Sequence, residues 1–402
     1  MKKILFVSGS LGLGHVGRDL EIARALRQRF PEIEISWMSE SPASEVLEEA
    51  GEKLLPEAHL LYSSNSELER SASQYKANLV RWVMNVRKGW AKNAEVYAGV
   101  SARYNFDLWV GDEAYDIMIA MNADNSLKKC PFVIIYDFFG LEATTLNPID
   151  HLVVYMTNRL WLKFLRSNPP LADQSIFIGE MADIPDKKFG FMQPNKRKLA
   201  EKALNFVGYV LPEDIEDYRD KMKARELLGY GSNPLVFCSI GGTAVGKDLL
   251  KLCVDAYPLV RKQIPDLDMV LVCGPRVQPD SIQAPEGVKV LGYLPNLYRH
   301  MGAADICVVS GGGTITLELT ALRKPFLYFP LEDHFEQEVE VANRCKRHRA
   351  GIKMTCSATN AEMLSEAIIS NMTKAVDYAT IPINGSKEAA RIIEGLLTTQ
   401  HI

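Results

Sequence analysis

The stretch ICVVSGGGTITLELTALRKPFLYFPLE, residues 306–332, decides the fold of this chain. A short β-branched run ends in three consecutive glycines, a helical segment follows, and a second apolar run, KPFLYFPL, comes next. Strand–helix–strand order of this kind predicts a parallel sheet whose strands are joined by crossover helices. The same order recurs in both halves of the chain, so we predict an α/β protein.

Two series of strands and helices are separated by a charged stretch. The first series begins with KILFVSG at 3–9 and the second with PLVFCSI at 234–240. The stretch between them is rich in charged residues and bracketed by proline and glycine, which is typical of a domain boundary. The pattern predicts an N-terminal Rossmann-like domain over 1–208, a linker over 209–233, a C-terminal Rossmann-like domain over 234–380, and a final helix over 381–402 whose packing partner it does not indicate.

Length, charge and cysteine usage limit the class of protein. The chain has 402 residues, more than the roughly 250 to 300 at which single cores stop growing. A net charge of -4 argues against a nucleic-acid partner. The seven cysteines include no CxxC pair and lie mostly in apolar runs, which predicts buried thiols in a reducing compartment. The apolar run near the N-terminus is short enough for a strand, and we expect a cytoplasmic protein.

The helix after the first strand has an apolar face. Val16, Leu20, Ala23, Leu26 and Phe30 recur at helical spacing, and this face is predicted to pack on the sheet. The opposite face is predicted to carry four charged side chains, Arg18, Glu21, Arg24 and Arg27.

Three glycine-rich loops follow predicted strands, at 9–15, 241–247 and 310–314. Backbone amides in such loops, together with a helix N-terminus, can bind an anion. In the second loop, Asp248 follows Lys247 where a P-loop needs Ser or Thr, which argues against a nucleoside triphosphatase. The first loop has the spacing G-x-x-G-x-G, so a dinucleotide site with Glu40 at the ribose is weakly supported.

His15 is the candidate general base. It follows the first glycine loop at the carboxyl end of a predicted strand, where open α/β sheets bind ligands. A helix N-terminus disfavours the imidazolium, so His15 can accept a proton, although a histidine that only caps the loop is an equal alternative. Asp112 is the first candidate for the acid that orients it, and Asp137 is the competitor.

Residues 310–344 resemble the donor-binding region of inverting GT-B glycosyltransferases. Residues 310–318 are similar to the core of the plant UDP-sugar transferase signature, and Glu336-Gln337 to its closing acidic residue and glutamine. Gly12, Gly14 and His15 resemble the N-terminal Gly-His loop, and residues 241–243 the Gly-Gly-Ser loop of the lipid-linked enzymes. The resemblance implies two Rossmann-like domains that face each other across a cleft, with the acceptor bound by the first and the donor by the second.

The resemblance also implies a role for each matching residue. His15, oriented by Asp112, would deprotonate the acceptor hydroxyl for in-line attack on the anomeric carbon. Glu318, expected in the first turn of its helix, would bind the ribose hydroxyls. The structural alternative is that Glu318 is a carboxylate at the start of the helix that interacts favourably with the helix dipole. The other implied donor contacts are Gly242, Thr243, Gly312, Gly313, Thr314 and Ile315 at the diphosphate, Tyr293 and Leu294 at the uracil, and Glu336 and Gln337 at the sugar, with Asp333 and His334 as rivals to the last pair. Gly14, in the N-terminal Gly-His loop, is also expected to bind the donor.

Departures from the family pattern leave parts of the site open. Ser310 stands where the plant enzymes have a histidine at the diphosphate, and Val16-Gly17 replaces a proline that often follows the N-terminal histidine. No Asp-x-Asp ends a strand, in agreement with a class that needs no metal; neither a metal nor a cofactor is expected. The alternatives are a sugar-nucleotide 2-epimerase and a non-catalytic nucleotide-sugar-binding subunit.

Two segments of the first half carry basic and aromatic residues at helical spacing, at 78–92 and 152–166. They could rest on an anionic bilayer at the inner face of the membrane and receive a lipid-linked acceptor. A core-facing stripe with a solvated basic face is the alternative. The side chains concerned are Trp82, Trp90, Tyr155, Trp161 and Phe164, with Arg81, Arg87, Lys88, Arg159, Lys163 and Arg166.

Overall fold

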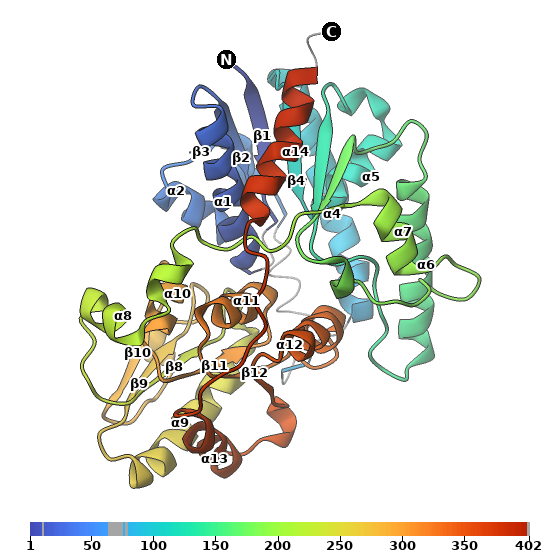
Figure 1. Cartoon of the computed structure of the whole chain (residues 1–402). Coiled ribbons are helices and arrows are strands. Elements are labelled where there is room, and N and C mark those ends of the chain that lie inside the picture. The colour runs from blue at the N-terminus through green and yellow to red at the C-terminus, as the bar shows by residue number, and fades with distance from the viewer. Residues whose placement is uncertain (10–11, 63–74, 77–78, 400–402) are drawn as a thin grey trace. The chain divides into compact units, whose positions relative to one another are not determined.

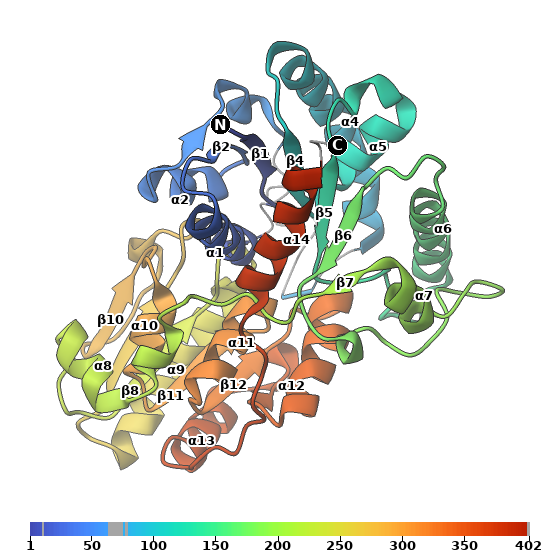
Figure 2. The same ribbon diagram turned by 45° about the horizontal axis from the view of Figure 1, so that its top comes forward.

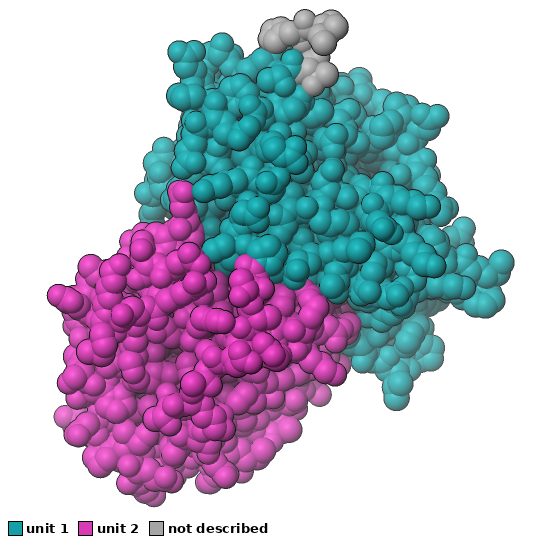
Figure 3. All heavy atoms as spheres, in the orientation of Figure 1, with its two compact units in different colours: residues 1–68, 79–211, 382–402 teal, residues 69–78, 212–381 magenta. Residues whose placement is uncertain are grey.

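The computed structural model describes residues 1–9, 12–62, 75–76 and 79–399 (Figure 1). The chain divides into two compact units, which Figure 3 colours separately. The first comprises residues 1–68, 79–211 and 382–402, and the second comprises residues 69–78 and 212–381. Each unit contains one parallel sheet with helices on its faces, which confirms the predicted α/β fold.

The sheet of the first unit has seven strands in the order β3-β2-β1-β4-β5-β6-β7 (Figure 2). Chain order reverses between β1 and its neighbour β4, so their carboxyl ends flank the switch point at which open α/β sheets bind ligands. The strands are β1 Lys3–Val7, β2 Glu34–Met38, β3 Lys53–Leu54, β4 Leu108–Asp112, β5 Phe132–Tyr136, β6 Gln174–Phe177 and β7 Asn205–Phe206. The helices are α1 Gly14–Arg29, α2 Ala43–Glu49, η1 Pro56–Leu60, α4 Leu79–Arg103, α5 Tyr115–Ala123, η2 Asn125–Leu127, α6 Pro148–Leu165, η3 Met181–Asp183, α7 Lys196–Ala203 and α14 Gly385–Thr399.

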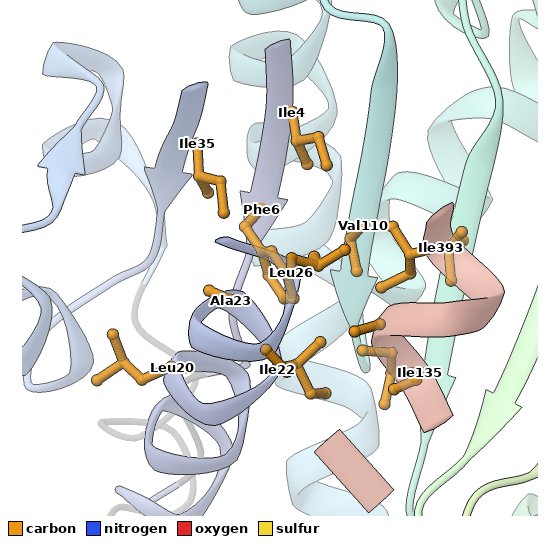
Figure 4. Packing of buried hydrophobic residues seen from close by; sticks show 14 of the residues in the cluster. Ile4, Phe6, Leu20, Ile22, Ala23, Leu26, Ile35, Val110, Ile135 and Ile393 are labelled. Atoms are coloured by element: carbon orange, nitrogen blue, oxygen red, sulfur yellow. The ribbon is translucent and has the colours of Figure 1, made fainter. Parts of the chain in front are cut away.

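The last helix of the chain, α14, packs on the first unit beside α1. Its Ala389, Ala390, Ile393 and Leu397 join Ile4 and Phe6 of β1 in one buried cluster (Figure 4). The alternate residues of β1, Leu5 and Val7, point to a second cluster on the other face of the sheet. The C-terminal segment therefore completes one face of the N-terminal sheet, a destination that its own sequence pattern does not reveal.

Helix α1 differs from its predicted orientation in two residues. Arg18 and Glu21, predicted opposite the apolar face, are buried with 6% and 8% of their surface exposed. Arg18 is buried at the carboxyl edge of the sheet, where Asp112 and Asp137 neutralise its charge. The helical spacing is correct, and Arg24 is exposed as predicted, but the part of the polar face that carries Arg18 and Glu21 is covered.

The sheet of the second unit has six strands in the order β10-β9-β8-β11-β12-β13, and chain order reverses between β8 and β11. The strands are β8 Leu235–Ser239, β9 Asp268–Val272, β10 Val288–Leu291, β11 Ile306–Ser310, β12 Phe326–Phe329 and β13 Ile352–Lys353. The helices are η4 Ile215–Tyr218, α8 Lys221–Leu228, η5 Ala244–Gly246, α9 Lys247–Gln263, η6 Pro279–Ser281, α10 Leu297–Gly302, α11 Gly313–Leu322, the π-helix η7 Glu336–Val341, α12 Ala342–His348, η8 Cys356–Ala358 and α13 Ala361–Asn371.

Two segments outside 234–380 fold with the second unit. The charged stretch that was expected as a linker contains η4 and α8, and its Arg225 donates to the carbonyl of Ala303 and to Asp305. Tyr75, from within the expected first domain, donates to the carbonyl of Phe329 at the end of β12.

The seven cysteines of the chain are all unbridged, and five of them are buried. Within the described ranges, no helix is long and apolar enough to cross a bilayer.

Candidate functional site

Close packing of two loops brings His15 to the end of β4. Gly9 lies two residues after the end of β1, and a Cβ at this position would lie 3.2 Å from both the carbonyl oxygen of Asp112 and Nδ1 of His15. Gly12 has a φ of 76°, in the region that favours glycine. His15 is the second residue of α1 and therefore lies at the switch point of the first sheet.

Of the two candidate acids, Asp112 is the one that contacts His15. The imidazole Nδ1 lies 3.0 Å from Oδ2 of Asp112, whose side chain is fully buried. Burial alone would raise the pKa of Asp112, but the charges of Arg18 and His15 hold this pKa below its ordinary value. A carboxylate on Nδ1 leaves Nε2 available as a proton acceptor.

Arg18 organises the carboxylates around His15, a role that the sequence did not indicate. Its Nε and Nη2 donate to the two oxygens of Asp112 at 2.9 and 2.6 Å, and its Nη1 donates to Oδ2 of Asp137 at 2.6 Å. Nη2 also lies 2.7 Å from Nδ1 of His15. Nδ1 of His15 must carry a proton to donate to Asp112, but it must be unprotonated to accept from Nη2 of Arg18. The two contacts therefore require opposite tautomers of His15. A bond from Nδ1–H to an ionised carboxylate is charge-assisted, which favours the tautomer with its proton on Nδ1.

Glu113 also belongs to this cluster and was missed by the sequence reasoning. It directly follows Asp112 with a φ of 49°, which places its Oε2 3.8 Å from Nε2 of His15. Burial, followed by the neighbouring charge of Asp137, raises the pKa of Glu113 well above its ordinary value. Despite burial, the guanidinium of Arg18 and the carboxyl of Glu113 keep the pKa of Asp137 very low. The sequence signal that could have identified Glu113 as a site residue is its position, one residue after the end of β4.

In the second unit, two predicted glycine loops meet at the switch point. A Cβ on Gly241 would lie 3.7 Å from Oγ of Ser310, so the loops after β8 and β11 are neighbours. Gly311 passes so close to Pro330 that a Cβ would lie 2.5 Å from its Cα. Helix α11 begins at Gly313, so the N–H groups of its first turn, including those of Thr314 and Ile315, lack helical acceptors. Gly242 and Thr243 follow in the neighbouring loop.

Glu318 lies in the second turn of α11, since this helix begins at Gly313, and the expected place in the first turn is wrong. The alternative of a helix-start carboxylate is therefore excluded. The side chain is half-buried, and burial raises its pKa to about 8. Among the residues that the structure describes, no hydrogen-bond donor contacts this carboxylate. Its acceptor atoms are available to a ligand with hydroxyl donors.

The acidic-glutamine pair lies at the start of the π-helix η7. A Cβ on Gly313 would lie 3.5 Å from Oε1 of Glu336, so this carboxylate is beside the N-terminus of α11. Oε1 of Gln337 accepts the N–H of Leu331 at 2.8 Å, which leaves its NH₂ group for a ligand. The rival residue His334 is half-buried, and its buried Nδ1 has no hydrogen-bond partner in the described part of the chain. Burial lowers its pKa to about 4.

The remaining predicted residues are less closely grouped. Tyr293 and Leu294 are half-buried and follow β10, at the same carboxyl edge but on the outermost strand of the sheet. The structure thus joins His15 to Asp112 in one unit, and the 310–318 loop to the 241–243 loop and Glu336 in the other.

The aromatic residues expected at a membrane mostly form core. Trp161 packs with Tyr115, Tyr136, Phe138 and Phe139, with ring centroids 5.1 to 6.1 Å apart. Trp90 lies against Tyr115 at 6.4 Å, and Phe164 packs on the same core. For these three side chains the core-facing alternative is correct. The side chains of Arg81, Trp82, Arg87 and Lys88 lie outside the described residues.

Comparison with known proteins shows which families this chain resembles. Residues 236–396 match the glycosyltransferase family 28 C-terminal domain. An uncharacterized glycosyltransferase of Methanosarcina acetivorans is 24% identical over 352 residues, which cover 85% of this chain and 83% of that protein. The UDP-N-acetylglucosamine–N-acetylmuramyl-(pentapeptide) pyrophosphoryl-undecaprenol N-acetylglucosamine transferase of Geobacillus thermodenitrificans is 25% identical over 185 residues, 45% of this chain and 48% of that enzyme. For several other relatives, too, the match covers about half of their length.

A solved structure has the same fold over the whole chain. The glycotransferase of kitacinnamycin superposes with a TM-score of 0.62 at 17% identity, covering 98% of this chain and 99% of that one. The two parallel sheets and this superposition show that the chain has the GT-B fold that is known from glycosyltransferases. More particularly, residues 236–396 are similar to the C-terminal domain of glycosyltransferase family 28.

Proposed function

We propose that this protein transfers a sugar from a UDP-sugar to an acceptor hydroxyl, with inversion at the anomeric carbon and without a metal ion. The His15–Asp112 pair at the switch point of the first sheet is the observation that carries this proposal. A similar transferase that uses UDP-N-acetylglucosamine supports the choice of nucleotide.

In the donor half, Glu318 accepts hydrogen bonds from both ribose hydroxyls. The available carboxylate and the adjoining glycine loops support this role. The amides of the loops and of the first turn of α11 stabilise the diphosphate as it leaves, in place of a cation. We assign the diphosphate to Gly242, Thr243, Gly312, Gly313, Thr314 and Ile315, the uracil to Tyr293 and Leu294, and the sugar hydroxyls to Glu336 and the NH₂ group of Gln337. We also assign Gly14, at the start of α1, to donor binding.

The chemical step is an in-line displacement. Nε2 of His15 removes the proton of the acceptor hydroxyl as its oxygen forms a bond to the anomeric carbon. The bond from that carbon to the diphosphate oxygen breaks on the opposite side, and the electron pair stays on the diphosphate. Asp112 stabilises the imidazolium, while Arg18 keeps Asp112 ionised. Attack from the face opposite to the leaving group inverts the configuration.

A thermal-shift screen of the full chain against UDP, GDP, TDP and CMP sugars tests the donor. A ligand at 100 times its dissociation constant stabilises a protein by about 2.7 kcal/mol, so a UDP-sugar is expected to raise the melting temperature most. The same donor is then incubated with and without candidate hydroxyl acceptors. A new sugar nucleotide formed in the absence of acceptor contradicts transfer in favour of an epimerase, and equal shifts for all four nucleotides contradict the uridine preference.

We propose that the acceptor is lipid-linked and is reached at the cytoplasmic face of the membrane, through the outer side of α6. Along this helix Ile149, Leu152 and Met156 are exposed, and Arg159, Lys163 and Arg166 continue the same side. The adjoining loop exposes Phe191 and Met192, at 81% and 84%, and is joined to α6 by Asn158, which donates to the carbonyl of Phe189. Apolar side chains followed by three cations complement an anionic bilayer surface.

Liposome co-sedimentation tests this surface. The protein is expected to pellet with anionic vesicles and to remain in the supernatant with zwitterionic ones. Because Leu152→Gln/Met156→Gln removes exposed apolar area from α6, this double variant should pellet several-fold less. Met222→Gln/Leu227→Gln changes two exposed apolar side chains of α8 and is the matched control. Equal recovery of wild type and the α6 variant in the supernatant would contradict the membrane contact.

A further inference from the structure

His15, Glu113 and Asp137 form a group that the proposed reaction uses only in part. One ligand atom from each of the three lies within 4.8 Å of the others. They come from the start of α1, the residue after β4 and the residue after β5, so three neighbouring chain segments converge here. The proposed reaction requires the imidazole but assigns nothing to the two carboxyls.

Both carboxyls have a buried oxygen with no donor. Within the described ranges, Oε1 of Glu113 and Oδ1 of Asp137 accept no hydrogen bond from an N–H or hydroxyl group, and the two carboxyls interact only with each other on this side. The Glu113 side chain is 9% exposed, and the other oxygen of Asp137 is bonded to Arg18. A buried acceptor that no donor satisfies is energetically unfavourable. Two such oxygens beside an imidazole nitrogen are therefore a suitable place for a cation.

The surroundings of His15 match those of a metal-bound histidine. Its Nδ1 contacts Asp112, and its Nε2 lies 3.8 Å from Oε2 of Glu113. Histidine ligands usually donate their second ring N–H to a carboxylate, which directs the lone pair of the first nitrogen at the metal. One imidazole and two carboxylates with an open position form a ligand set that Zn²⁺ and Co²⁺ accept.

The local charges also balance. Asp112, Asp137 and Glu113 supply three negative charges when ionised, and Arg18 supplies one positive charge. The guanidinium binds Oδ2 of Asp137 and leaves Oδ1 on the side of Glu113. One divalent cation makes the cluster neutral, so the nearby guanidinium does not exclude it.

We propose that His15, Glu113 and Asp137 bind one divalent transition-metal ion, Zn²⁺ or Co²⁺, in the first unit. The bound ion occupies the lone pair of Nε2. If His15 is the base of the proposed transfer, the ion therefore inhibits the reaction. The binding site itself does not depend on that function.

Binding of Co²⁺ to the EDTA-treated full-length protein tests the site without any activity assay. We expect one equivalent per chain, a visible ligand-field band in the absorption spectrum, and displacement of the band by Zn²⁺. Glu113→Gln removes a carboxylate ligand and keeps the length of the side chain, so it should weaken Co²⁺ binding at least tenfold. Glu48→Gln, an exposed change on α2, is the control and should leave binding unaltered.

His15→Ala gives a second test should Glu113→Gln fail to fold, and the band should vanish in it. Undiminished Co²⁺ binding by either folded variant, or no stoichiometric binding by the wild type, overturns the site. Zn²⁺ is then added to the transfer assay and removed with EDTA. Binding with undiminished transfer contradicts His15 as the base but supports the site, whereas His15-dependent transfer without any metal binding contradicts the site alone.

Discussion

Replacing His15 by alanine is expected to lower the turnover of sugar transfer about 10²-fold or more while UDP affinity survives. General bases contribute roughly 10²–10⁴-fold, and His15 would act on the acceptor hydroxyl rather than on the nucleotide. The assay is steady-state transfer with saturating donor, together with calorimetric titration of UDP. His59→Ala, which removes an exposed histidine of the same unit, is the matched control and should retain full turnover.

The cluster around His15 sharpens this test. Asp112 accepts two bonds from Arg18 as well as contacting His15, so Asp112→Asn should reduce turnover and also destabilise the first unit. His15→Ala leaves the Arg18 bonds to Asp112 and Asp137 in place, so its melting temperature should change little. Unchanged turnover in folded His15→Ala would remove the base from the mechanism, whereas UDP binding with no turnover in the wild-type protein would favour a non-catalytic nucleotide-sugar-binding subunit.

Glu318→Gln is expected to weaken UDP binding at least tenfold and yet to stabilise the protein at alkaline pH. Hydrogen bonds to a charged acceptor contribute about 1.5–3 kcal/mol, and the amide cannot accept both ribose hydroxyls as an ionised carboxylate does. Calorimetric titration of UDP at pH 8 measures the loss of affinity. Glu362→Gln, an exposed substitution on α13 in the same unit, is the control.

The stability effect follows from the pKa of Glu318. Burial raises this pKa from 4.5 to about 8, so the folded state favours the protonated carboxyl. Stability is therefore lost as the pH rises from about 4.5 to about 8, and the full cost remains above pH 8. Allowing for the partly exposed side chain, we expect Glu318→Gln to stabilise by about 2 kcal/mol at pH 9, or about 4–8 °C in melting temperature, and by little at pH 5.

The same pKa predicts the pH dependence of UDP binding. The ionised carboxylate is the better acceptor, so binding should release a proton, and affinity should rise by up to tenfold per pH unit toward pH 8 and level off above. The terminal phosphate of UDP also titrates near pH 6, and Glu318→Gln measures that contribution alone. Identical pH profiles for wild type and Glu318→Gln would contradict the ribose role.

The candidate site shows which of its parts local sequence could predict. Glycine loops after strands and the histidine beside the first loop are local patterns, because a parallel strand must turn into its crossover helix at the carboxyl edge. The structure pairs His15 with Asp112 and not with Asp137, and Arg18 lies between these groups. Arg18 binds both oxygens of Asp112 but only one oxygen of Asp137. Helical periodicity assigned Arg18 to the solvent face of α1, because periodicity carries no information about charged partners elsewhere in the chain.

The sequence by itself determined the two parallel α/β series, the glycine loops and His15 at a strand end, because hydrophobic period and backbone freedom are properties of neighbouring residues. Only the tertiary structure decided the partner of His15, the burial of Arg18 and Glu113, the place of Glu318 in the second turn of α11, and the packing of α14 against the first sheet. Each of these depends on charges or apolar surfaces that chain segments far apart in sequence bring together.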